Sequence, residues 1–161
     1  MFRSKNILIV DDDADDRFMF REALREINAS FICIECENGK DALELLSAQN
    51  AVLPDYIFLD LNMPPLNGYQ FLSAIKKRKN LCHIPVIIYT TSRYESDKEE
   101  TKRLGAAHFI SKPCSLEEIC AQLRFALSRK WEKQPLAVGG ESNIKHQTSN
   151  IKRHKPAHAM M

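Results

Sequence analysis

Four consecutive apolar residues, 56–59, run directly into a single carboxylate, Asp60, and then into Asn-Met-Pro-Pro. An apolar run this short, without polar alternation, is typical of a strand that is buried on both faces of a parallel sheet. The prolines that follow cannot continue a hydrogen-bonded ladder, so they end the strand. We therefore expect Asp60 at the carboxyl end of a central strand, where open α/β sheets place their ligands.

Short apolar segments of this kind alternate along the chain with amphipathic segments. Strands are predicted at 6–10, 31–35, 56–60, 85–90 and 106–111, and helices at 14–28, 40–48, 69–77, 92–103 and from 115 to about 130. Inward positions such as Ala42, Leu45 and Leu46 of the second helix recur at helical spacing. This order predicts an α/β fold, a parallel sheet with helices on both faces and right-handed crossovers.

The net charge is unevenly distributed along the chain. The 161 residues carry a formal net charge of +2, but four basic residues against one acid from Gln134 onward leave the preceding residues at −1. Helical periodicity also ends near Pro135. We expect a domain over residues 1–133 and a flexible basic tail over 134–161, too short and too polar for a second folded module. Nothing in this balance requires a nucleic-acid partner.

The sequence also predicts where the protein works. No apolar run approaches the roughly 20 residues that span a bilayer, and the first residues do not form a signal peptide. We expect a cytoplasmic protein without a membrane partner. Five cysteines, an odd number, argue against a disulfide framework. Cys33 and Cys36 have C-x-x-C spacing, but in a strand they point to opposite faces, so we interpret them as packed thiols.

Polar and charged residues stand at the carboxyl ends of four predicted strands, which meet at one edge of a parallel sheet. They are Asp11, Asp12 and Asp13 after the first strand, Asp60 after the third, Thr90 with Thr91 and Ser92 at the fourth, and Lys112 after the fifth. Asp13 is also well placed to cap the helix that follows.

These residue types together favour phosphoryl chemistry. Clustered carboxylates repel unless a cation lies between them, and oxygen ligands suit a hard ion such as Mg²⁺. Asp60 could then act as a nucleophile and become an aspartyl phosphate. Lys112 would balance the charge on the phosphoryl oxygens, and Thr90 could donate a hydrogen bond to one of them.

Four motifs carry a resemblance to a known family: Ile-Leu-Ile-Val-Asp11-Asp12, Phe-Leu-Asp60-Leu-Asn-Met-Pro, Pro-Val-Ile-Ile-Tyr-Thr90 and Ser-Lys112-Pro. With them, residues 6 to about 129 resemble the receiver domain of two-component response regulators, of the stand-alone, chemotaxis-regulator-like kind. The resemblance implies a flavodoxin-like, doubly wound sheet in the order 2-1-3-4-5. It implies that Asp60 accepts a phosphoryl group from a histidine kinase or a histidine phosphotransfer protein. Asp11, Asp12, Asp60 and the backbone carbonyl of Asn62 would hold Mg²⁺.

The resemblance further implies a switch. The Thr90 hydroxyl would move toward the phosphoryl group, and an aromatic residue three positions before the lysine, here Phe109, would turn inward. The face made by the fourth helix, fifth strand and fifth helix would then bind a downstream protein. Thr91 departs from the alanine or glycine that is usual in the family, and it would border the phosphoryl group. A core role for Phe109 remains an alternative.

We expect a single-domain response regulator, a monomer or weak dimer, rather than an enzyme; whether it relays phosphate or ends the pathway stays open. The same residues leave two alternative functions to compare with this one. An unphosphorylated interaction scaffold on the same fold would not need the acids, threonine and lysine. A Mg²⁺-dependent phosphohydrolase resembling the haloacid dehalogenase family would need a second aspartate two residues after the nucleophile, where this chain has Asn62.

Overall fold

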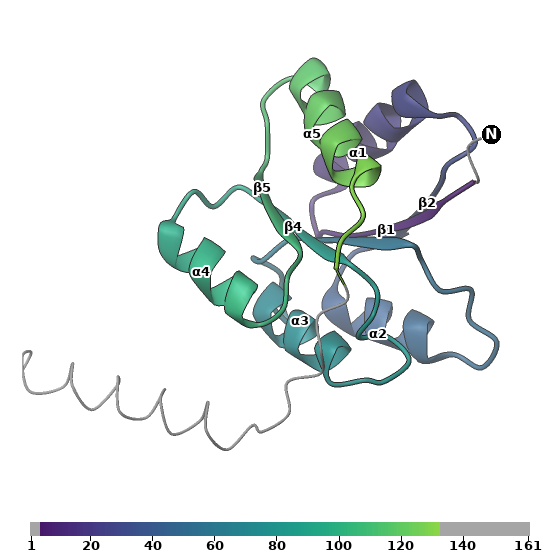
Figure 1. Ribbon diagram of the computed structural model, residues 1–161, viewed down its shortest axis with the longest axis vertical. Helices are drawn as coiled ribbons and strands as arrows, with labels where there is room; N and C mark the ends of the chain where they lie inside the picture. The colour runs from purple at the N-terminus through teal and green to yellow at the C-terminus, as the bar shows by residue number, and fades with distance from the viewer. Residues whose placement is uncertain (1–3, 133–161) are drawn as a thin grey trace, which may run out of the picture.

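A computed structural model describes residues 4–132, in which strands and helices alternate from the first element to the last (Figure 1). The elements are β1 (Asn6–Val10), α1 (Ala14–Ile27), β2 (Ile32–Cys36), α2 (Gly39–Ser47), β3 (Tyr56–Leu59), α3 (Gly68–Lys76), β4 (Val86–Thr90), α4 (Glu95–Arg103), β5 (His108–Ser111) and α5 (Leu116–Ser128). The predicted tail, 134–161, lies outside the described residues. None of the helices in residues 4–132 is both long and apolar enough to cross a bilayer.

The five strands form one parallel sheet in the order β2-β1-β3-β4-β5, as the sequence predicted. Figure 1 shows α1 and α5 on one face of the sheet and α2, α3 and α4 on the other. The fold is therefore the doubly wound, flavodoxin-like architecture that the sequence predicted.

Each face of the sheet has its own hydrophobic core, because successive strand residues point to opposite faces. In β1, Ile7 and Ile9 pack toward α1 and α5, whereas Leu8 and Val10 pack toward α2 and α3. On the first face, the ring of Phe20 lies 4.9 Å from that of Phe58 and 5.5 Å from that of Tyr89, both in edge-on geometry. Burial on both faces explains why the central strands read as uninterrupted apolar runs.

Polar side chains cap the N-termini of four of the five helices in residues 4–132. Asp13 accepts a hydrogen bond from the backbone N–H of Asp16 at the start of α1, and Ser115 accepts one from Glu118 at the start of α5. Asn38 caps α2, and Asn67 forms a reciprocal capping box with Gln70 at the start of α3. The expected capping role of Asp13 is confirmed. These bonds satisfy backbone donors that the first turn of a helix leaves without partners.

Two details of the sequence prediction are wrong. The fourth helix begins at Glu95 rather than Ser92, because the Ser92 hydroxyl donates to Asp97 and its carbonyl accepts from Ser111, which holds this segment as a loop. Leu45 was expected to face the core but is 39% exposed. Leu43 packs against the core instead.

The two cysteines of β2 lie as expected. Cys33 packs toward α1 and α5, and Cys36 packs toward α2 and α3. They belong to opposite faces of the sheet, as the strand geometry predicted. The thiols of both residues are free.

The fold leaves no room for a side chain at Gly68, where α3 begins. A Cβ there would lie 2.3 Å from the carbonyl oxygen of Asp60 and 2.7 Å from Cα of Leu61, and neither backbone atom can rotate away. We expect Gly68→Ala to lower the free energy of unfolding by about 3 kcal/mol, measured by urea denaturation. In the control Gly39→Ala, the nearest atom is the movable Cδ2 of Leu66 at 3.1 Å, so the loss should be under about 1 kcal/mol. Equal losses would contradict this explanation.

Candidate functional site

Strand register places two carboxylates side by side. Val10 of β1 pairs with Leu59 of β3, and the backbone N–H of Asp60 donates to the carbonyl of Val10 at 3.0 Å. The next residues along these strands, Asp11 and Asp60, therefore leave the sheet together. Asp11 is fully buried and Asp60 nearly so.

The β4–β5 pair adds a hydroxyl and an ammonium to the same edge. Thr90 pairs with Ser111, and the backbone N–H of Lys112 donates to the carbonyl of Thr90 at 2.7 Å. Lys112 then turns its side chain inward, so that its Nζ lies 2.7 Å from Asp11 Oδ2 and 3.9 Å from Asp60 Oδ2. The buried Thr90 hydroxyl is close enough to the Asp60 carboxylate to lower its pKa. The structure thus brings together the acids, threonine and lysine that the sequence placed at strand ends.

Asp12 joins this group and Asp13 does not. One carboxylate oxygen each from Asp11, Asp12 and Asp60 lies within 4.8 Å of the others, with Asp12 on the exposed side. Asp13 instead caps α1, and its backbone N–H donates to Asp11 Oδ1 at 3.0 Å.

The three carboxylates fit a hard divalent cation. Asp11 Oδ2 is buried without a well-aligned hydrogen-bond donor, because its 2.7 Å contact with Lys112 Nζ is an ion pair of poor angle. An oxygen in that condition can accept a metal ion at low cost. Clustered carboxylate oxygens are also the donor set that Mg²⁺ and Mn²⁺ prefer.

Burial controls the ionisation of these groups. It raises the pKa of Asp11 to about 6, against the opposing effects of Lys112 and the Asp13 N–H. It raises the pKa of Asp60 in the same way, opposed by Lys112 and by the Thr90 hydroxyl. Burial by itself would lower the pKa of Lys112, but its bonds to Asp11 and Asp16 outweigh that effect and raise it. The lysine is therefore charged throughout the physiological range.

Asp16 is a neighbour of this site that sequence reasoning missed. Its Oδ2 accepts a hydrogen bond from Lys112 Nζ at 2.7 Å. As an acid in the first turn of a helix, it is explained by the helix dipole alone, so the sequence contains no separate signal for it. Arg17 was missed as well, and its Nη1 donates to the Asp11 carbonyl at 2.7 Å.

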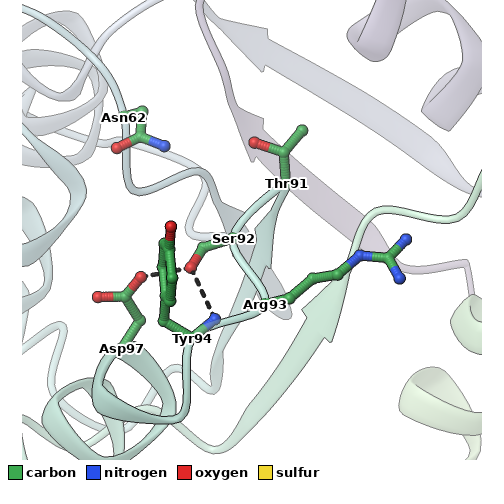
Figure 2. A pocket seen from close by; sticks show the side chains of 6 residues that line it. All are labelled: Asn62, Thr91, Ser92, Arg93, Tyr94 and Asp97. Atoms are coloured by element: carbon green, nitrogen blue, oxygen red, sulfur yellow. Dashed lines mark hydrogen bonds between the residues drawn. The ribbon is translucent and has the colours of Figure 1, made fainter.

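A hollow of about 550 Å³ adjoins the site on the side of the β4–α4 loop (Figure 2). Thr91 stands exposed at this hollow, and Asn62 lines it from the β3–α3 loop. The hydroxyl of Ser92 donates to Asp97 and accepts the backbone N–H of Tyr94 at 3.3 Å, whereas Figure 2 shows the Arg93 side chain pointing away. The Ser92 hydroxyl therefore ties the β4–α4 loop to Asp97 in the first turn of α4.

Asp97 also receives a hydrogen bond from the Tyr69 hydroxyl, which joins α3 to the first turn of α4. Phe109 lies half-buried on β5 and faces α4, with the Lys98 ammonium 5.9 Å from its ring. The structure thus places the expected switch residue between the sheet and α4. Phe109 also packs against the core, as the alternative interpretation required.

Comparison with known proteins agrees with this geometry. The sequence profile described as "Response regulator receiver domain" matches residues 7–124. The protein PilH of Pseudomonas aeruginosa is 33% identical over 122 residues, which cover 76% of this chain and 97% of PilH. Several other curated relatives are longer, and the chain spans 58% of one transcriptional regulatory protein and 13% of one sensor histidine kinase.

Two solved structures show the same fold. The phosphorylated cyanobacterial phytochrome response regulator RcpA superposes with a TM-score of 0.72 at 28% identity, covering 84% of this chain and all of RcpA. The Mn²⁺-bound form of the response regulator Rcp1 superposes with a TM-score of 0.70 at 29% identity, covering 83% of this chain and 99% of Rcp1. A divalent cation has therefore been seen in a protein of this fold.

Without divalent cations, we expect Asp11 to make stability depend on pH. Its pKa rises from 3.8 to about 6 on folding, so between those values the folded chain binds more protons than the unfolded chain. The free energy of unfolding that depends on this group should fall by roughly 2–3 kcal/mol as the pH rises from about 4 to about 6. Asp11→Asn should remove that fall in urea denaturation with EDTA.

The exposed Asp15→Asn serves as the control and should keep the wild-type profile. Titrating groups that do not interact with Asp11, such as His108, are common to all three proteins and cancel in the difference. Parallel pH profiles for wild type and Asp11→Asn would contradict the assignment.

Proposed function

The chain belongs to the family of response regulator receiver domains, signalling proteins of two-component systems, and we propose that Asp60 is its phosphoacceptor. The observation that carries the proposal is the setting of this carboxylate. Asp60 lies at the end of a central strand, where the Thr90 hydroxyl favours its ionised form and the Lys112 ammonium is 3.9 Å away. The donor would be a phosphohistidine of a histidine kinase or of a histidine phosphotransfer protein.

The reaction needs little from the protein beyond positioning. A carboxylate oxygen of Asp60 attacks the phosphorus atom, the phosphorus–nitrogen bond of the donor breaks, and its electron pair returns to the imidazole. No general base is required, because a carboxylate nucleophile has no proton to lose. Lys112 and Thr90 are close enough to Asp60 to balance the charge and hydrogen-bond the oxygens of the transferred group.

A divalent cation, Mg²⁺ in our proposal, would be held by Asp11, Asp12 and Asp60, with the backbone carbonyl of Asn62 as a further ligand. When bound, it supplies positive charge that offsets the repulsion between the carboxylates and the incoming phosphoryl group. The buried and poorly satisfied Asp11 Oδ2 supports this assignment. The Mn²⁺-bound relative supports it independently.

We propose that phosphorylation changes the surface formed by α4, β5 and α5. The Thr90 hydroxyl would move toward the phosphoryl group and Phe109 would turn inward behind it. Phe109 is already half-buried beside α4, and α4 buries a single residue, Thr101. A helix with so little buried surface can shift at low cost, which suits a surface that binds a downstream protein in one state.

We further propose a single-domain regulator in the cytoplasm, with its receiver domain over residues 1–133, acting as a monomer or weak dimer in a two-component system or phosphorelay. PilH, which this chain covers over nearly its whole length, supports the single-domain interpretation. A phosphohydrolase is disfavoured, because the side chain two residues after Asp60 is the amide of Asn62, which cannot act as a general acid.

The phosphoacceptor proposal can be tested by intact-protein mass spectrometry. Incubation with acetyl phosphate and Mg²⁺ should add one phosphoryl group to the wild type and none to Asp60→Asn, and EDTA should abolish the gain. Asp55→Asn is the matched control, since Asp55 lies at the opposite end of β3 and should leave the gain intact. A gain that persisted in Asp60→Asn would reject Asp60 as the acceptor.

Thr91 should prolong the life of the phosphoryl group, because its exposed side chain stands at the hollow beside the site. Thr91→Ala should shorten the half-life of the phosphorylated protein by about three- to tenfold, since water gains access to the phosphorus. The control is Arg93→Ala, whose side chain extends away from Asn62 and Asp97 (Figure 2). Equal half-lives for Thr91→Ala and wild type would reject this role.

A further inference from the structure

The Lys112 ammonium contacts two carboxylates, Asp11 and Asp16, which differ in burial. Its Nζ donates a well-aligned hydrogen bond to Asp16 Oδ2 at 2.7 Å. The contact with Asp11 Oδ2 has the same length but a poor angle, and Asp60 Oδ2 is farther away at 3.9 Å. The lysine therefore points at the α1 side of the site more directly than at the proposed phosphoacceptor.

We infer that Asp16 is a positioning residue that holds the Lys112 ammonium to one side of the carboxylate cluster until a phosphoryl group arrives. This inference rests on the proposed function and concerns the resting state of the same site. It assigns to Asp16 a role that its place in the first turn of α1 does not by itself explain.

The argument begins with the charges that attract Lys112. Asp11 and Asp60 are both buried, so an ammonium at short range from them is held strongly. A lysine drawn fully between these two carboxylates would stand where a divalent cation has to bind. Asp16 pulls the ammonium in another direction and leaves the Asp11–Asp12–Asp60 oxygens facing one another within 4.8 Å.

The second step is the difference in exposure between the two partners of Lys112. The side chain of Asp16 is 38% exposed, whereas that of Asp11 is 0% exposed. When the ammonium leaves Asp16, water can solvate the carboxylate, so the ion pair can be broken at modest cost. Release from a fully buried partner would leave an uncompensated charge. Asp16 is therefore suited to hold Lys112 reversibly.

The surroundings restrict the lysine to a short swing. Its backbone N–H is bonded to Thr90, and its Nζ lies 5.7 Å from the centre of the Tyr89 ring. Asp16 is fixed as well, because its backbone N–H is bonded to Asp13 Oδ1 at 3.0 Å. With both backbones held, only the lysine side chain needs to turn from Asp16 toward a phosphoryl group on Asp60.

The test compares Asp16→Asn with Asp15→Asn, which removes the same charge from the same helical turn at an exposed position. Calorimetric titration would measure the affinity for Mg²⁺, and then, at saturating Mg²⁺, the affinity for beryllofluoride as a phosphoryl mimic. Asp16→Asn should weaken Mg²⁺ binding about fivefold, because Lys112 moves toward the metal ligands, and should strengthen beryllofluoride binding about threefold, because Lys112 is already released. Asp15→Asn should change either affinity by less than about twofold.

Opposite changes in the two affinities separate positioning from a structural role. Loss of a structural contact would weaken both ligands together, and would not be rescued by Asp16→Glu, which keeps the charge. In a Lys112→Met background the effect of Asp16→Asn on Mg²⁺ affinity should fall to that of Asp15→Asn, since the lysine that transmits it is gone. An effect that persisted in that background would overturn the inference.

The remaining outcomes distinguish this inference from the function on which it rests. If the wild type binds beryllofluoride and Asp16→Asn behaves like Asp15→Asn in both titrations, only the role of Asp16 is rejected. If the wild type with saturating Mg²⁺ binds no beryllofluoride, the phosphoacceptor proposal is rejected and this inference falls with it.

Discussion

Buried negative charge at one edge of the sheet is the constraint on which this structure depends. Asp11 and Asp60 leave adjacent parallel strands where solvent scarcely reaches, and like charges in such surroundings repel strongly. Lys112 supplies the counter-charge from the end of β5, and the neighbouring carboxylates raise its pKa against the opposing effect of burial. A register shift that moved Asp11, Asp60 or Lys112 would leave a buried charge without its partner, at a cost of several kcal/mol. Strand register and site electrostatics therefore stabilise each other.

The same repulsion between buried carboxylates explains how such a site can respond to a ligand. Burial pushes both carboxylates toward their neutral forms, and a divalent cation or a rearranged lysine relieves that effect. The Tyr69–Asp97–Ser92 hydrogen bonds connect the loop after β4 to α3 and α4, so a change at Thr90 has a continuous set of contacts through which to reach the surface. These contacts are physical neighbours; their energetic coupling is a separate property.

Most of the fold could be predicted from the sequence, because its determinants are local. Uninterrupted apolar runs mark strands buried on both faces, and the residues that end those runs reach a common edge whenever the strands are parallel. Errors arose where a tertiary contact overrode the local pattern. Ser92 and Asp97 delay the start of α4, and the placement of α2 leaves Leu45 at the surface while Leu43 packs inward.

The sequence by itself determined the alternation of elements, the four strand ends that carry the acids, the threonine and the lysine, and the capping of α1 by Asp13. Only the tertiary structure decided that the Lys112 ammonium contacts both Asp11 and Asp16. Asp16 and Lys112 are 96 residues apart, and their contact depends on where α1 lies relative to the turn after β5. No periodicity or motif records that distance, because an acid in the first turn of a helix is favoured by the helix dipole whether or not a lysine lies beside it.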